Sequence, residues 1–129
     1  METNQLIFWI AAALLLAIVF RRAWRRRMIK NYTAGELEER LRDGSPVVLL
    51  DVRTVGEHRS GNIKNSLHIP LHELRRRLKE LEQHRRQEIV CYCQSGSRSL
   101  SAAALLVREG FAAANLRGGM SEWNFHHLK

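Results

Sequence analysis

EIVCYCQSGSRSLSAAALLVREG, at residues 88–110, is the stretch that decides the fold. Its first six residues, 88–93, form a short apolar run that is typical of a β-strand buried on both faces. Residues 99–109 are rich in alanine and leucine and predict a helix, which Gly110 ends. The five residues between the two segments predict a tight loop. The stretch therefore predicts a strand, a loop and a helix, which is the repeating unit of an α/β protein.

The same alternation extends to both sides of this stretch. VVLLD at 47–51 predicts a second buried strand, and brief strands are expected at 67–69 and 113–116. Helices are expected from a capping box at Thr33 to Arg42, over 54–60 as a short helix or loop, over 71–81 where leucines follow a helical spacing, and over 121–127. This order favours a parallel sheet covered by helices on both faces. In such sheets ligands bind beyond the carboxyl ends of the strands, so the loop after 88–93 is where chemistry is expected.

That loop reads CQSGSRS at 93–99. Gly96 permits a turn whose backbone N–H groups converge on an anion. The unpaired N–H groups of the following helix and the guanidinium of Arg98 add positive charge around the same point. A thiol in these surroundings is expected to have a lowered pKa and to be largely thiolate at neutral pH. The loop therefore predicts that Cys93 is a nucleophile in a cradle for an anion.

Four segments resemble, in order, the single-domain rhodaneses, a family of sulfurtransferases. They are DVR at 51–53, EHRSGNIKNSLHIPL at 57–71, CQSGSRS at 93–99 and GGMSEW at 118–123. The resemblance covers residues 33–126. This sequence departs from the usual family pattern at four positions outside the loop, namely Thr54, Asn62, Asn65 and Ser66. These departures leave the expected rhodanese-like fold intact and affect only contacts at its rim.

The resemblance implies a catalytic role for Cys93 and Arg98. Cys93 would take a sulfane sulfur from a small anionic donor such as thiosulfate and become a persulfide. It would then pass the sulfur to an acceptor, which is cyanide or a thiol, including a thiol on a partner protein. The residues implied to bind the donor are Gln94, Ser95, Gly96, Ser97 and Ser99. Asp51 and Arg53 are implied to support the loop. The chemistry needs no metal and no organic cofactor.

Two other functions stay open from the sequence. One is a non-catalytic rhodanese-like docking or regulatory module, although inactive members commonly lack the cysteine that this chain keeps. The other is a phosphatase or arsenate reductase of related fold, whose loops have five residues between cysteine and arginine where this chain has four, 94–97. Cys91, two residues before Cys93, faces the same side of the strand. It is either a buried thiol or a partner that could form a disulfide with Cys93.

The N-terminal region has a different character. Residues 6–20 read LIFWIAAALLLAIVF, and a basic cluster, RRAWRRRMIK, follows at 21–30. The apolar run spans about 22 Å as a helix, and its flanking residues extend it toward the roughly 30 Å of a bilayer core. The alternatives are a buried core helix, which an apolar surface on every side argues against, and a signal peptide, which carries its positive charge before the run. Arginines after the run place the rest of the chain in the cytoplasm.

The sequence thus divides into an N-terminal tail (1–5), a transmembrane helix (6–24), a basic juxtamembrane linker (25–32) and a rhodanese-like domain (33–129). The expected location is the inner, cytoplasmic membrane, with a single span and the catalytic domain in the cytoplasm. The formal charge of the 129 residues is +8, but residues 31–129 hold 15 basic and 12 acidic residues, so the excess belongs to the membrane-flanking cluster. No nucleic-acid partner is expected, and two cysteines exclude a disulfide-stapled scaffold.

Overall fold

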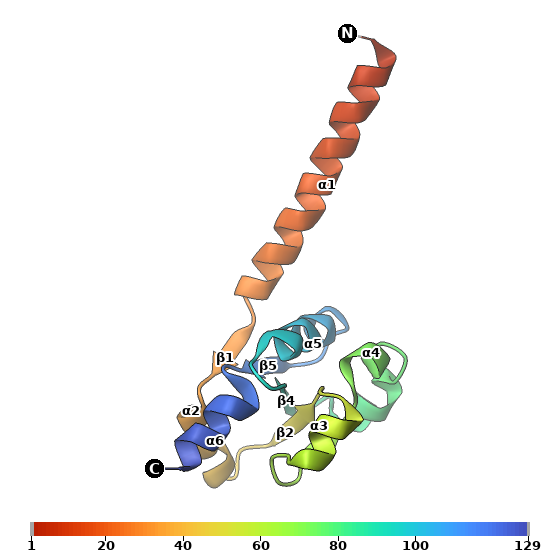
Figure 1. Ribbon diagram of the computed structural model, residues 1–129. Helices are drawn as coiled ribbons and strands as arrows, with labels where there is room; N and C mark the ends of the chain where they lie inside the picture. The colour runs from red at the N-terminus through yellow and green to blue at the C-terminus, as the bar shows by residue number, and fades with distance from the viewer. Residues whose placement is uncertain (1, 129) are drawn as a thin grey trace.

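A five-stranded parallel sheet organises the computed structural model, which describes residues 2–128 (Figure 1). The strands lie in the order β1-β5-β4-β2-β3, and each neighbouring pair is parallel. They are β1 (Lys30–Tyr32), β2 (Val47–Asp51), β3 (Leu67–His68), β4 (Glu88–Tyr92) and β5 (Ala113–Leu116). The helices are α1 (Thr3–Arg27), α2 (Ala34–Arg42), α3 (Val55–Ser60), α4 (Leu71–Leu74), the 3₁₀ segment η1 (Leu78–His84), α5 (Ser97–Arg108) and α6 (Gly119–His127). The predicted α/β fold is confirmed.

Helices cover both faces of the sheet, as predicted. Side chains of the central strand β4 alternate between two apolar clusters, because successive residues of a strand point to opposite faces. Ile89 and Cys91 pack in a cluster with α4, η1 and α5, whereas Val90 and Tyr92 pack in a cluster with α2 and α6. All four side chains are completely buried. The sheet is therefore the middle layer of three.

The leucine spacing over 71–81 predicts one helix, and this prediction is wrong. The structure has the single turn of α4, an irregular turn at 75–77 and then the 3₁₀ segment η1. Leu74 and Leu81 are nevertheless fully buried, so the leucines pack as a core-facing row. A spacing of three residues satisfies a 3₁₀ helix as well as an α-helix, so the pattern does not distinguish the two.

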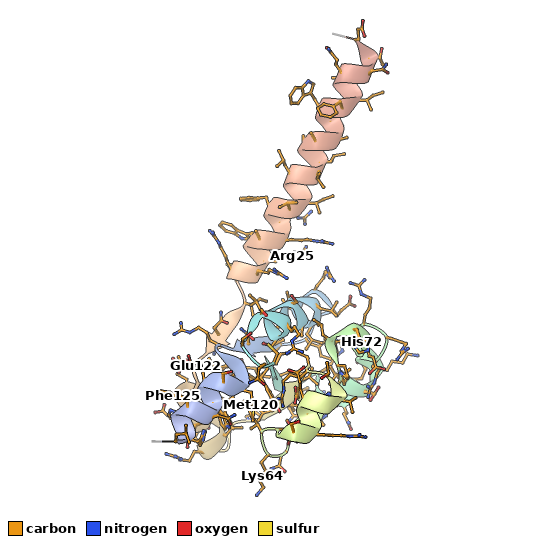
Figure 2. All side chains as sticks on the ribbon, viewed as in Figure 1. Arg25, Lys64, His72, Met120, Glu122 and Phe125 are labelled. Atoms are coloured by element: carbon orange, nitrogen blue, oxygen red, sulfur yellow. The ribbon has the colours of Figure 1, made fainter. Side chains whose placement is uncertain are left out.

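Helix α1 is long and apolar enough to cross a membrane. Its 25 residues span about 37 Å at ~1.5 Å per residue, against roughly 30 Å for a bilayer core. None of its residues is buried, and Figures 1 and 2 show most of its length projecting away from the domain. The structure therefore does not use α1 as a core helix. An N-terminal signal sequence can have the same length and composition, and it is the arginines after the run that favour an anchor.

The linker predicted over 25–32 has regular structure at both ends. Helix α1 continues to Arg27, and β1 then pairs with β5 at the edge of the sheet. Only two residues separate the helix from the strand, so the sheet begins directly below α1. The sequence analysis missed β1 because three residues beside a basic cluster are too short to show an alternation.

Two helices start earlier than predicted, and both do so behind a glycine. Helix α5 begins at Ser97 after Gly96, and α6 begins at Gly119 after Gly118. Gly96 and Gly118 have φ angles of 103° and 78°, in the left-handed region that favours glycine. These two turns bring the first residues of α5 and α6 to the carboxyl end of β4.

Candidate active site

The carboxyl end of β4 holds a cysteine inside a closed turn. Cys93 follows β4 directly, and its side chain is completely buried. The backbone N–H of Gly96 donates a hydrogen bond to Cys93 Sγ at 3.0 Å, and the hydroxyl of Ser99 donates one at 3.3 Å. The positive φ of Gly96 turns the chain back over the sulfur. The loop and the first turn of α5 thus surround one sulfur atom with donors.

These donors decide how the thiol ionises. Burial on its own raises the pKa of Cys93, because it disfavours the charged thiolate. The hydroxyl and the backbone N–H of Ser99, with the backbone N–H groups of Gly96 and Ser95, stabilise the thiolate and outweigh burial. The net effect holds the pKa of Cys93 below its ordinary value of 9.0. The loop therefore opposes the effect of burial and favours the thiolate, which is the nucleophilic form of cysteine.

Helix α6 holds the opposite side of the loop. The backbone N–H of Met120 donates to the carbonyl of Cys93 at 2.8 Å, and that of Ser121 donates to the carbonyl of Gln94 at 3.1 Å. Met120 lies where α6 meets the sheet (Figure 2). A Cβ at Gly119 would lie 2.4 Å from the Cys93 carbonyl oxygen, so glycine is required for this close approach. Because α6 takes these two carbonyls, the loop keeps its N–H groups directed at the sulfur.

A polar side chain in β5 supports the loop from below. The side-chain amide of Asn115 is buried and donates to the carbonyl of Gly96 at 3.3 Å. The same nitrogen lies 2.9 Å from the side-chain oxygen of Asn31 in β1. The edge strand that the sequence analysis missed is therefore connected to the loop through a single residue.

Asp51 and Arg53, the predicted supporting residues, form a buried ion pair beside the loop. The guanidinium of Arg53 donates to Asp51 at 2.8 Å, to the carbonyl of Gly61 at 2.6 Å and to the side-chain oxygen of Gln94 at 3.4 Å. His58 contacts the same carboxylate at 2.8 Å. Burial raises the pKa of Asp51, but the hydrogen bonds from Arg53 and His58 outweigh it and hold that pKa below its usual range. The pair remains ionised and fixes Gln94 at the rim.

Arg98 is held by a partner that the sequence analysis missed. Its guanidinium donates to both carboxylate oxygens of Glu57, at 2.7 and 2.8 Å. These hydrogen bonds, supported by Thr54, lower the pKa of Glu57 to about 2. The signal was present in the sequence, because Thr54 and Glu57 have capping-box spacing, and both halves of the box form at the start of α3. Arg98 therefore stands at the rim of the loop as a paired cation.

The structure brings the predicted site residues to one place with different exposure. Cys93, Gly96 and Ser99 are buried around the sulfur, whereas Gln94, Ser95 and Ser97 are exposed at the surface of the loop. Cys91 lies deeper in the same apolar cluster as Cys93, and both thiols are free. Between residues 2 and 128, no group of three or more His, Cys, Asp or Glu side chains could hold a metal ion.

Known proteins resemble this chain in sequence and in fold. Residues 33–126 match the Rhodanese-like domain family. The chain is 37% identical over 102 residues to a sulfurtransferase of Allochromatium vinosum, a match that covers 78% of this chain and 94% of the relative. Among solved structures, a rhodanese-related protein from Thermoplasma volcanium is similar with a TM-score of 0.69 and 32% identity, over 75% of this chain and 92% of that one. A thiosulfate sulfurtransferase from Pseudomonas aeruginosa is similar with a TM-score of 0.70 and 26% identity, over 78% of this chain and 20% of that one. The chain belongs to the family of rhodanese-like domains.

Proposed function

We propose that this protein is a membrane-anchored sulfurtransferase that carries a sulfane sulfur on Cys93. The observation that supports the proposal best is the ring of donors on the buried Sγ, which includes the Gly96 N–H and the Ser99 hydroxyl. These donors lower the pKa of a fully buried thiol, and a cysteine that serves only packing has no need of them. The sulfurtransferase among the relatives supports the same reaction class.

The reaction has two steps that return the enzyme to its starting state. First, the Cys93 thiolate attacks the outer sulfur of thiosulfate or a related persulfide donor. The bond from Sγ to this sulfur forms while the donor's S–S bond breaks, and the rest of the donor leaves with the electron pair, as sulfite from thiosulfate or as a thiolate from a persulfide. The terminal sulfur of the new persulfide carries the negative charge, which loop N–H groups stabilise. Second, a thiolate or cyanide attacks the terminal sulfur, the bond to Sγ breaks, and the Cys93 thiolate is restored.

The surrounding residues have separate parts in this scheme. Arg98 attracts an anionic donor to the rim, where Gln94, Ser95 and Ser97 form the exposed entrance. Asp51 and Arg53 position Gln94 and do not take part in bond changes. Because the Cys93 side chain is completely covered, uptake of sulfur requires the residues of the entrance to move aside.

The anchor is the second part of the proposal. Helix α1 would span the membrane over residues 6–24, with the arginines that follow on the cytoplasmic side. The domain from residue 33 onward would then face the cytoplasm, where thiols stay reduced and Cys93 stays available. A sulfur donor or acceptor at the inner membrane would meet the loop there.

An intact-mass measurement tests the sulfur chemistry directly. The full chain, reduced and purified in detergent, is incubated with thiosulfate and weighed. We expect a gain of about 32 Da, the mass of one sulfur, which a thiol reductant removes. Cys93→Ser should abolish the gain and Cys91→Ser should retain it, so the second variant controls for the loss of a thiol from the same strand.

The opposite outcome is equally informative. If the wild-type chain gains no mass, and an alkylating probe modifies Cys93 near neutral pH no faster than it modifies a free thiol, the loop does not activate its cysteine. The protein would then be a rhodanese-like docking or regulatory module and not an enzyme.

A further inference from the structure

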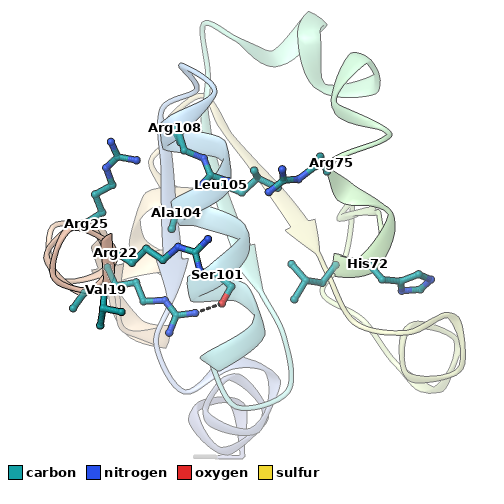
Figure 3. Close-up of a pocket in the computed structure, with 12 residues that line it drawn as sticks. Val19, Arg22, Arg25, His72, Arg75, Ser101, Ala104, Leu105 and Arg108 are labelled. Atoms are coloured by element: carbon teal, nitrogen blue, oxygen red, sulfur yellow. Dashed lines mark hydrogen bonds between the residues drawn. The ribbon is translucent and has the colours of Figure 1, made fainter. Parts of the chain in front are cut away.

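A large basic cavity lies between the C-terminal end of α1 and the domain. It has a volume of about 810 Å³ and is bounded by α1, the turn that begins at the end of α4, and α5. Five arginines line it, and they come from all three elements: Arg22, Arg25, Arg26, Arg75 and Arg108. Figure 3 shows Arg75 extending from the α4 side toward Leu105 of α5. The elements thus gather cations that are distant in the sequence.

The charge of this cavity is uncompensated. No Asp or Glu among residues 2–128 lines it, and no carboxylate in that range lies within ion-pair distance of any of the five arginines. Other arginines of the domain do have such partners, for example Arg77 with Glu80 and Arg85 with Glu82. The arrangement is fixed at one point by Arg26, which donates to the hydroxyl of Ser101 at 2.6 Å. A cavity with this excess of cations selects an anion.

The walls of the cavity add a second requirement. Val19 and Ala23 on α1, with Leu71 and Leu105 on the domain side, supply apolar surface between the arginines. Val19 belongs to the apolar run of α1, which continues away from the domain (Figure 1). A ligand that fits both features carries an anionic group with an apolar chain attached. A free inorganic anion would leave the apolar walls unused, and a nucleic acid would find no Phe, Tyr or Trp in the lining on which to stack its bases.

The geometry points to a binding site for one anionic phospholipid, with its headgroup phosphate among the arginines and its acyl chains along α1. This inference rests on the proposed membrane anchoring, which puts residues 21–27 at the level of the headgroups. A lipid bound there would connect α1 to α4 and α5. Because α5 begins at the active loop, the lipid would fix the orientation of the Cys93 entrance relative to the membrane.

Native mass spectrometry of the full chain, released from detergent with phosphatidylglycerol present, tests the site. We expect one retained phosphatidylglycerol per chain and little retention of phosphatidylcholine. The double variant Arg75→Gln/Arg108→Gln removes two cavity cations from the domain and should weaken retention about tenfold or more. Lys79→Gln/Arg86→Gln is the matched control, since it removes the same charge from exposed positions outside the cavity, and it should change retention less than about twofold.

Three results would overturn the inference. Equal loss in both double variants would mean that general surface charge attracts the lipid. Full competition by soluble glycerol phosphate would mean that the cavity selects a free anion and not a lipid. If a carbonate wash extracts the full chain from phosphatidylcholine vesicles, the chain is not anchored, and the lipid site that depends on the anchor is refuted as well. A chain that stays in the vesicles while both variants behave alike would leave the anchor intact and refute the lipid site alone.

Discussion

Cys91 and Cys93 lie two residues apart, face the same apolar cluster and are both completely buried. The pKa values of their thiols are nevertheless shifted in opposite directions. Burial raises the pKa of Cys91 well above its usual range, and the negative charge on Cys93 adds to the rise. Burial also raises the pKa of Cys93, but there the loop donors reverse the sign. The two sites therefore separate the effect of burial from the effect of hydrogen bonding.

The difference follows from where the sheet ends. Cys91 is in register with Leu50 of β2 and Asn115 of β5, so the N–H groups around it serve the ladders of the sheet. Cys93 lies beyond β4, where the ladder stops and the backbone N–H groups of the loop are free to turn toward the sulfur. Beyond the carboxyl edge of this sheet, N–H groups that the ladder does not use can therefore bond to the Cys93 sulfur.

A substitution that displaces the loop itself should change the reactivity of Cys93 most. In Gly119→Ala, the new Cβ would lie 2.4 Å from the Cys93 carbonyl oxygen, at a φ of 55° that disfavours alanine. The loop must shift away from α6, and its donors lose their alignment on the sulfur. We expect the rates of sulfur uptake and of Cys93 alkylation to fall about 100-fold, as for a misplacement near 1 Å. Both are measured by intact mass against time.

Gly35→Ala is the control for this substitution. Its new Cβ would meet only His126, at an ordinary contact distance of 3.5 Å, and Gly35 lies in α2 and not in the loop. It should leave the alkylation rate unchanged. A wild-type rate in Gly119→Ala would show that α6 does not hold the loop, and the contrast between the two cysteines would then depend on α5 alone.

A smaller change should raise the pKa of Cys93 part of the way toward that of Cys91. Ser99→Ala removes one donor at 3.3 Å from Sγ and keeps the backbone of α5. The pKa of Cys93 should rise, so the midpoint of its alkylation rate against pH moves to higher pH. The thiolate fraction near neutral pH should fall about tenfold, the usual effect of one hydrogen bond to a charged group. Ser101→Ala, one turn along from the loop, is the control. An unchanged midpoint in Ser99→Ala would show that the Ser99 hydroxyl does not lower the pKa of Cys93.

Much of this contrast could be predicted from the sequence. The strand, the loop and the sequence CQSGSRS at 93–99 predict a thiolate in a ring of donors, because the spacing of Cys93, Gly96 and the helix start is local. What could not be predicted is long-range. The contact of Gly119 with the Cys93 carbonyl and the bond from Asn115 to Gly96 depend on how β5 and α6 return to the loop. No periodicity along the chain specifies those approaches.

The pairing of Arg98 shows the same limit in another form. The sequence indicates a cation beside the cysteine, but not that Glu57, 41 residues away, accepts hydrogen bonds from both terminal nitrogens of its guanidinium. The capping box that begins α3 also directs Glu57 to the loop, so one local motif serves a distant contact. A free Arg98 would present more positive charge to an anionic sulfur donor than an Arg98 that is paired with Glu57.

Glu57→Gln offers the finest test, because it changes charge and little else. Glutamine keeps the capping box, while the Arg98 guanidinium loses its ionic partner. The pKa of Cys93 should then fall slightly, alkylation near neutral pH should rise about twofold, and the KM for thiosulfate should drop by a similar factor, since the pair is partly solvated. Glu80→Gln, which breaks the exposed ion pair of Arg77, should leave all three unchanged.

The pH dependence of unfolding tests the same pair from the side of stability. The pKa of Glu57 is lowered to about 2, so the folded state favours its carboxylate. Its stabilising effect is therefore complete above the ordinary pKa of 4.5 and is lost as the pH falls through about 2. The difference in urea midpoint between wild type and Glu57→Gln should stay constant above about pH 5, correspond to no more than about 1 kcal/mol, and shrink in more acidic solution.

If that difference is absent at every pH while the KM still drops, Glu57 contributes nothing to folding and acts only on the charge that the sulfur donor meets. If the KM rises instead, the carboxylate holds Arg98 in the position that the donor needs, and the contrast between Cys91 and Cys93 depends on the direction of Arg98 as well as on the loop donors.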